Sequence, residues 1–163
     1  MPINTQKPYP KRPRLHDRSS YIGERLYFIT ITTNKRNQFF VHEHITKSMI
    51  NYLYDISQKK LFDVLVYCFM PDHVHLLLRG TSHSSNLTKF ISAYKQKTGF
   101  TFKKRFDANL WAKSFHDHVL RKEEKIQNIG KYILENPVRA GLVENMLDYP
   151  YSGSFTYDLE KFI

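Results

Sequence analysis

Apolar residues are spaced along this chain in segments whose pattern distinguishes strands from helices. Residues 25–33 are rich in β-branched and aromatic side chains, which is typical of a strand. Residues 61–69 form an apolar run that predicts a buried strand, and residues 73–79 resume extended structure after the tight connection at residues 70–72, so a hairpin is expected. Residues 110–121 are predicted to form a further, partly irregular strand.

Three other segments place apolar residues at helical intervals. They cover residues 43–59, 86–106 and 123–135, and the last one ends where Pro137 follows Asn136. The elements therefore follow one another as strand, helix, strand, strand, helix, strand and helix. This order predicts an α+β sandwich, in which a mainly antiparallel sheet of four or more strands carries its helices on one face.

Length and cysteine content narrow the class of protein. The chain has 163 residues, which is enough for one domain with a substantial core. Cys68 is the single cysteine, so an intramolecular disulfide is impossible. The sequence also has neither the apolar stretch of a signal peptide nor an apolar run long enough to span a membrane. We therefore expect a cytoplasmic protein.

The positive charge of the chain is concentrated in two segments. Lys and Arg number 25 against 15 Asp and Glu, a formal net charge of +10. Residues 1–18 hold five basic side chains and one acidic, and residues 85–105 hold six basic and no acidic side chains. With 15% aromatic residues, this distribution indicates a protein that binds nucleic acid. We expect a flexible basic arm over residues 1–20 and one folded domain over residues 21–163. The basic residues expected to bind DNA are Lys11, Arg12, Arg14, Lys89, Lys95, Lys97, Lys103, Lys104 and Arg105.

Two histidines are the first candidates for chemistry. His73 and His75 are two residues apart on a predicted strand, so both imidazoles project from one face while Val74 projects from the other. Such a pair suits a divalent metal, although the spacing alone is a weak signal and two surface residues are the alternative. The apolar face would pack against helices, which leaves the histidine face open to a substrate.

Tyr132 and Asn136 are four residues apart on the last predicted helix, along the border of its apolar stripe. Tyr132 is either a candidate nucleophile or a half-buried core tyrosine. Asn136 is either a candidate metal ligand or the N-cap of a short helical turn that Pro137 would begin. A helix packed through its stripe would present both side chains at the edge of the sheet.

At these positions the sequence resembles a known family. Residues 67–78, which read Tyr-Cys-Phe-Met-Pro-Asp-His-Val-His-Leu-Leu-Leu, resemble the HUH metal-binding strand of single-tyrosine, IS200-like transposases. Residues 131–143 resemble the tyrosine-helix signature of REP-associated tyrosine transposases. Residues 110–121 resemble the strand before that helix and residues 149–152 the usual end, so the likeness covers about residues 21–155.

The resemblance implies a ferredoxin-like domain that cuts and rejoins single-stranded DNA, typically beside a short hairpin and without ATP. It makes Tyr132 the nucleophile, which would form a 5′-phosphotyrosine. It makes His73, His75 and Asn136 the protein ligands of a divalent metal, Mg²⁺ or Mn²⁺. Insertion-sequence relatives carry glutamine at the third ligand position, so the asparagine favours the REP-associated branch. The expected protein is a metal-dependent endonuclease and strand transferase that acts as a monomer or homodimer.

Several alternatives stay open from the residues alone. A basic, aromatic domain of the same fold could bind single-stranded DNA or RNA without cutting it. A metal phosphodiesterase would use water in place of Tyr132. Residues 116–118, which read His-Asp-His, could supply a base or a second metal cluster. Asp72 could orient the neighbouring imidazole or serve as a turn residue.

Overall fold

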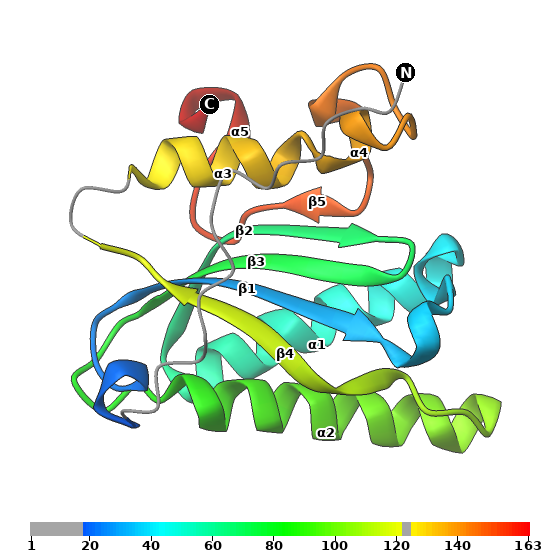
Figure 1. Cartoon of the computed structure of the whole chain (residues 1–163), viewed down its shortest axis with the longest axis horizontal. Helices are drawn as coiled ribbons and strands as arrows, with labels where there is room; N and C mark the ends of the chain where they lie inside the picture. The colour runs from blue at the N-terminus through cyan, green and yellow to red at the C-terminus, as the bar shows by residue number, and fades with distance from the viewer. Residues whose placement is uncertain (1–17, 122–124) are drawn as a thin grey trace.

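The computed structural model describes residues 18–121 and 125–163, which form a five-stranded sheet with helices on both faces (Figure 1). The strands are β1 (Leu26–Thr33), β2 (Phe62–Met70), β3 (His73–Gly80), β4 (Trp111–Val119) and β5 (Ser152–Gly153). The helices are α1 (Glu43–Lys60), α2 (Leu87–Phe106), α3 (Ile126–Leu134), α4 (Asn136–Arg139) and α5 (Leu159–Phe162). The predicted strands and helices are all present, and their described ends lie close to the expected positions.

The sheet is antiparallel, with the strand order β4-β1-β3-β2-β5. β2 and β3 form the predicted hairpin, in which Met70 pairs with His73. β1 lies between β3 and β4 and pairs with both of them. Because β1 to β4 alternate with α1 and α2 in the order β-α-β-β-α-β, the fold has the expected ferredoxin-like α+β arrangement.

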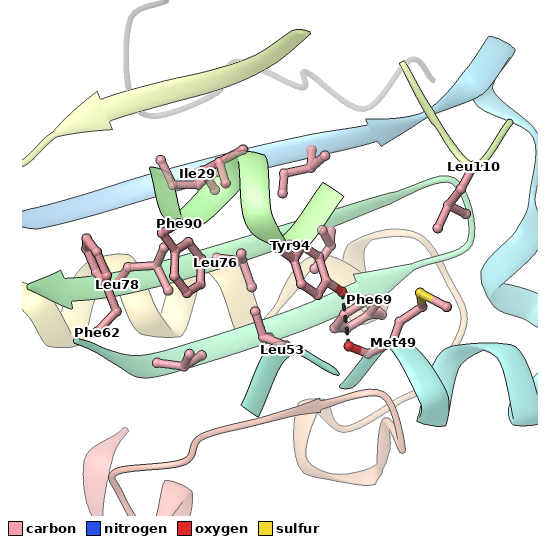
Figure 2. Close-up of a cluster of buried hydrophobic side chains, with 14 of the residues drawn as sticks. Ile29, Met49, Leu53, Phe62, Phe69, Leu76, Leu78, Phe90, Tyr94 and Leu110 are labelled. Atoms are coloured by element: carbon pink, nitrogen blue, oxygen red, sulfur yellow. Dashed lines mark hydrogen bonds between the residues drawn. The ribbon is translucent and has the colours of Figure 1, made fainter. Parts of the chain in front are cut away.

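α1 and α2 pack on one face of this sheet. Leu76 and Leu78 of β3 are fully buried there together with Phe90 and Tyr94 of α2 (Figure 2). The Tyr94 hydroxyl donates a hydrogen bond of 3.0 Å to the backbone carbonyl of Met49 in α1. This bond satisfies the polar end of a buried ring, and it links α2 to α1.

α3 covers the opposite face, which corrects one detail of the prediction, since the helices were expected on a single face (Figure 1). Ile129, Ile133 and Leu134 of α3 are fully buried in a second apolar cluster, where they meet Cys68 of β2 and Leu77 of β3. The α+β class and the antiparallel sheet are confirmed, and the sheet is sandwiched between two helical layers.

The sequence of β2 explains why a second layer is needed. Val64 belongs to the cluster under α1 and α2, whereas Leu65 and Val66 belong to the cluster under α3. The register between β2 and β3 shifts between Val64 and Val66, so two consecutive residues fall on the α3 face. A strand with apolar side chains on both faces must be covered on both faces.

The ends of the described chain pack against this sandwich. β5 extends the sheet by pairing Gly153 with Tyr67 of β2. α5 brings the Phe162 ring against Gly130 of α3, where an added Cβ would lie 2.3 Å from the ring. Residues 1–17 of the predicted arm lie outside the described residues, and the described chain starts with a 3-10 helix at residues 18–21. Within the described ranges, no helix has the length and apolar character needed to span a membrane.

Replacing Ile133 by Ala is expected to lower the free energy of unfolding by about 2–5 kcal/mol, because the change leaves a cavity between α3 and the sheet. Equilibrium urea denaturation followed by circular dichroism measures this loss. Leu142→Ala, at a residue that is 46% exposed, is the control and should change the same quantity by less than about 0.5 kcal/mol. Equal losses in the two variants would contradict the packing of α3 on the sheet.

Candidate active site

The two histidines lie on β3, on the face of the sheet that α3 covers. His75 is buried, with 6% of its surface exposed, and His73 is partly exposed. Their Nε2 atoms are 3.1 Å apart, and the ring planes are inclined by 79°. The two imidazoles therefore lie on one face of the sheet, as their two-residue spacing predicts, and their Nε2 atoms point toward each other.

The second ring nitrogen of each histidine, Nδ1, lies within hydrogen-bond distance of a neighbouring side chain. His73 Nδ1 is 2.6 Å from Asp72 Oδ1 in the β2–β3 turn, and His75 Nδ1 is 2.9 Å from Thr30 Oγ1 on β1. Arg36 Nη1 donates a hydrogen bond of 3.2 Å to the second carboxylate oxygen of Asp72. Burial raises the pKa of Asp72, but the hydrogen bonds from His73 and Arg36 outweigh burial and hold this pKa below its ordinary value. Asp72 is therefore a carboxylate that orients the His73 ring.

This pair of imidazoles fits a divalent metal. Two adjacent ligand atoms of an octahedral site with bonds of about 2.1 Å lie about 3.0 Å apart. The Nε2 atoms of His73 and His75, at 3.1 Å, already have this spacing. Metal-binding histidines usually donate their second ring nitrogen to a carboxylate or another acceptor, which corresponds to the contacts with Asp72 and Thr30.

Tyr132 lies on α3 above the same face. The Phe28 ring of β1 contacts both parts of the site, because its centroid is 6.1 Å from that of Tyr132 and 5.6 Å from that of His75. Arg139 of α4 lies over the Tyr132 ring, with its guanidinium carbon 4.3 Å from the centroid. The tyrosine is half-buried at the border of the second apolar cluster. Its ring thus has a packing role and also lies in the neighbourhood of the histidines.

Asn136 closes the end of α3. Its Nδ2 donates hydrogen bonds to the carbonyl oxygens of Tyr132 at 3.1 Å and Ile133 at 3.0 Å. α4 begins at Asn136 itself and has Glu135 as its N-cap residue, without a side-chain cap bond. The predicted N-cap role of Asn136 is therefore corrected, because its side chain bonds back to the preceding helix. Since the amide nitrogen is used in this way, Oδ1 is the atom of this side chain that remains for a ligand.

Comparison with known proteins identifies the family to which this chain is similar. The profile of the family described as "Transposase IS200 like" matches residues 24–136. The chain belongs to this family. It is 30% identical over 148 residues to a candidate REP-associated tyrosine transposase of Haemophilus influenzae, which covers 83% of this chain and 82% of that protein. It is 23% identical over 141 residues to the REP-associated tyrosine transposase of Escherichia coli K12, with 83% and 79% covered.

A solved structure extends the likeness from sequence to fold. It is that of a REP-associated tyrosine transposase bound to a REP hairpin, and it matches with a TM-score of 0.69 at 19% identity. The match covers 88% of this chain and 82% of that one. The resemblance to REP-associated tyrosine transposases is confirmed by these relatives, and the α+β fold is confirmed by the shared structure.

In this member of the IS200-like family, the His-Asp-His segment of β4 does not form a metal cluster with other described residues. His116 pairs across the sheet with Thr30, which pairs with His75, so His116 lies on the histidine face two strands away. Asp117 points to the other face, where its Oδ2 accepts a hydrogen bond of 2.9 Å from the Tyr21 hydroxyl. In residues 18–121 and 125–163, no group of three or more His, Cys, Asp or Glu side chains is arranged to hold a metal.

The predicted basic residues of α2 lie away from the histidines, because α2 packs on the opposite face of the sheet. Lys95 Nζ donates to the carbonyl of Ala112 at 2.6 Å, and Lys97 Nζ lies 5.5 Å from the centroid of the Tyr52 ring. The remaining basic residues of this helix are exposed: Lys89, Lys103, Lys104 and Arg105. The arm residues lie outside the described part of the chain: Lys11, Arg12 and Arg14.

Four side chains around the site were not predicted from the sequence: Phe28, Thr30, Arg36 and Arg139. Thr30 and Phe28 are near His75 because β1 pairs with β3, and a pattern within one strand does not say which strand lies beside it. Arg36 reaches Asp72 from the segment after β1. Arg139 had a detectable signal, since it lies within the tyrosine-helix signature, seven residues after the tyrosine.

Cys68 is expected to be inert in the folded protein. It pairs across the sheet with His75 and is fully buried, and burial raises the pKa of its thiol to about 12. At pH 8 the thiolate is therefore nearly absent, and iodoacetamide should leave native Cys68 unmodified while it fully alkylates the protein unfolded in urea. Intact-protein mass spectrometry measures both reactions. Rapid alkylation of the native protein would contradict the burial of β2.

Proposed function

We propose that this chain is a metal-dependent endonuclease and strand transferase of single-stranded DNA, which acts through a covalent bond to Tyr132. What supports the proposal is that α3 and its end, which carry Tyr132 and Asn136, lie over the face of the sheet that bears His73 and His75. In the proposed site, Tyr132 would supply a hydroxyl nucleophile, His73 and His75 two imidazoles, and Asn136 an amide oxygen. These are the groups that transesterification at phosphorus requires.

A phosphodiester resists attack because its negative charge repels nucleophiles and its 3′ oxygen is a poor leaving group. A Mg²⁺ or Mn²⁺ ion held by His73, His75 and Asn136 would supply positive charge to the scissile phosphate. Arg139, whose guanidinium carbon lies 4.3 Å from the centroid of the Tyr132 ring, would supply a second positive charge near the tyrosine. The role of the protein is to hold these groups in position while the tyrosine reacts.

In the proposed reaction, Tyr132 Oη attacks phosphorus. The bond from Oη to phosphorus forms while the bond from phosphorus to the 3′ oxygen breaks, and a proton passes from the phenol to the leaving oxygen by way of the solvent. The products are a 5′-phosphotyrosine and a free 3′-hydroxyl. The 3′-hydroxyl of a second strand reverses the reaction and restores a phosphodiester. Because one phosphoester bond replaces another at each step, no nucleotide cofactor is needed.

The proposed substrate is single-stranded DNA that carries a hairpin. The family membership, the formal net charge of +10 and the relative whose structure contains a REP hairpin support this choice. The exposed basic residues of α2 lie on the face opposite the histidines, so they would bind phosphates at a distance from the cut.

A trapping assay tests this function. The protein is incubated with Mn²⁺ and end-labelled oligonucleotides that carry hairpins from its own flanking DNA, and is then resolved under denaturing conditions. We expect a covalent protein–DNA band that requires the metal and is lost in Tyr132→Phe, because phenylalanine has no nucleophilic oxygen. Tyr54→Phe, at a tyrosine of α1 that is 48% exposed, is the matched control and should retain the band.

Two other results of the same assay would favour a different function. Cleavage that persists in Tyr132→Phe but is lost in His73→Ala would indicate a metal phosphodiesterase that uses water. Tight DNA binding by the wild-type protein without cleavage, with any metal, would indicate a binding module of the same fold. Each result would contradict the proposed role of the tyrosine.

Binding to single-stranded DNA should weaken steeply as salt concentration rises, because each neutralised phosphate releases counterions. Replacing the exposed basic residues at the end of α2 by Gln, at positions Lys103, Lys104 and Arg105, should reduce the slope of log Kobs against log salt by up to about 2. Fluorescence anisotropy at several salt concentrations measures the slope. Lys59→Gln with Lys60→Gln, at the corresponding end of α1, is the control. A slope that is flat in the wild type would refute the role of charge.

A further inference from the structure

Five polar side chains form one continuous row of contacts through the histidine pair. Arg36 contacts Asp72 at 3.2 Å, and Asp72 contacts His73 at 2.6 Å. His73 contacts His75 at 3.1 Å, and His75 contacts Thr30 at 2.9 Å. In a row of this kind, each group must donate where its neighbour accepts. The two ends of the row therefore determine where the protons of the imidazoles lie.

One end of the row fixes the tautomer of His73. A carboxylate accepts hydrogen bonds and cannot donate them, so His73 Nδ1 carries the proton that is donated to Asp72 Oδ1. A neutral imidazole has one N–H, which leaves His73 Nε2 with a lone pair. Arg36 donates to the other oxygen of Asp72 with a guanidinium that is always charged, and this keeps Asp72 an acceptor.

The other end of the row allows His75 to take either tautomer. Without a metal, the lone pair of His73 Nε2 must accept, so His75 donates from Nε2 and its Nδ1 accepts from the Thr30 hydroxyl. His75 could hold a divalent metal through Nε2 only in the opposite tautomer, in which its Nδ1–H would be donated to Thr30 Oγ1. A hydroxyl serves both states because it can donate or accept.

We propose that Arg36, Asp72 and Thr30 are positioning residues that hold His73 permanently in the metal-binding tautomer and let His75 switch into it. In the switch, one proton leaves Nε2 of His75 for water, one proton is taken up from water at Nδ1, and the hydrogen bond with Thr30 reverses. The imidazole stays neutral, so the switch releases no net proton. The part of this inference that concerns the metal-bound state rests on the proposed function.

The backbone of the segment that carries Arg36 is hydrogen-bonded to the turn that carries Asp72. Arg36 and the residue before it have positive φ values of 55° and 52°, which non-glycine residues rarely adopt unless their surroundings impose them. The N–H of Thr33 donates to the carbonyl of Asp72 at 2.9 Å, and the N–H of Phe40 donates to the carbonyl of Pro71 at 3.0 Å. The segment that carries Arg36 is thus tied on both sides to the turn that carries Asp72.

Long-range ¹H–¹⁵N NMR of protein labelled with ¹⁵N-histidine reads the tautomers, because it distinguishes ring nitrogens with a proton from those with a lone pair. In the metal-free protein at neutral pH we expect His73 with its proton on Nδ1 and His75 with its proton on Nε2. On saturation with Mg²⁺ we expect His75 to carry its proton on Nδ1 and His73 to be unchanged. A proton on Nε2 of His73 in the metal-free protein, alone or together with one on Nδ1, would overturn the inference.

Mn²⁺ affinity, measured from the electron paramagnetic resonance signal of the free ion, tests the positioning residues individually. Asp72→Ala and Thr30→Val should each weaken binding by about 10-fold to 100-fold, and Arg36→Ala by less than Asp72→Ala. Thr30→Ser should restore binding, since serine keeps the hydroxyl. Asp63→Ala is the matched control, because Asp63 binds Arg79 at 2.6 Å at the other end of the same hairpin. Wild-type affinity in Thr30→Val would refute the role of the hydroxyl.

The experiments separate failure of this inference from failure of the proposed function. If the expected tautomers and affinity losses are found but no covalent DNA band forms, the function fails and the positioning role stands. If the band forms while His75 keeps its proton on Nε2 in the metal-bound protein, the positioning role of Thr30 fails. If neither Mg²⁺ nor Mn²⁺ binds, the metal-bound half of the inference is refuted together with the metal dependence of the function. The half of the inference that concerns the metal-free protein is tested separately, by the positions of the ring protons of His73 and His75 without metal.

Discussion

The register of β3 against its two neighbours is the constraint on which the site depends. In this register, His75 lies opposite Thr30 on one side and Cys68 on the other. Because side chains alternate along a strand, a slip of one residue would turn both histidines into the apolar layer of α1 and α2. It would also turn Leu76 and Leu78, which are fully buried in that layer, toward α3. The burial of Leu76 and Leu78 under α1 and α2 therefore keeps His73 and His75 on the opposite face of the sheet.

Because both faces of the central hairpin are covered, the histidine pair and the basic residues of α2 lie on opposite faces of the sheet. Both faces of β2 and β3 are apolar enough to require a cover, and α1 and α2 occupy one of them. The other is covered by the short α3, which leaves His73 partly exposed beside it. The basic residues of α2 consequently lie across the sheet from the histidines. A DNA strand that contacts both regions has to pass around an edge of the sheet, and β4 is the edge strand beside α2 (Figure 1).

Local periodicity is sufficient to predict the elements and the shared face of His73 and His75, because both are properties of a single strand or helix. It does not predict the face of the sheet on which α3 packs. The apolar run of β2 has side chains on both faces, and periodicity does not say which helix covers which face. It also does not find Thr30, whose contact with His75 exists through pairing between strands that are distant in sequence. The hydrogen bonds of Asn136 are missed for a different reason. Asparagine before proline is a common N-cap pattern, but here Asn136 is the first residue of α4, Glu135 is the N-cap residue, and the Asn136 side chain donates to the preceding helix.

The end of α3 connects the position of the tyrosine to that of the asparagine. The backbone carbonyl of Tyr132 accepts a hydrogen bond from Asn136 Nδ2 at 3.1 Å and another from Arg139 Nη2 at 2.7 Å. Without these donors, that carbonyl would be among the unsatisfied groups at a helix end. The same two residues also reach the chemistry proposed for the site, one through its amide oxygen and the other through a guanidinium over the Tyr132 ring. A shift of α4 therefore cannot move the third metal-ligand candidate without also disturbing the helix turn that carries the nucleophile candidate.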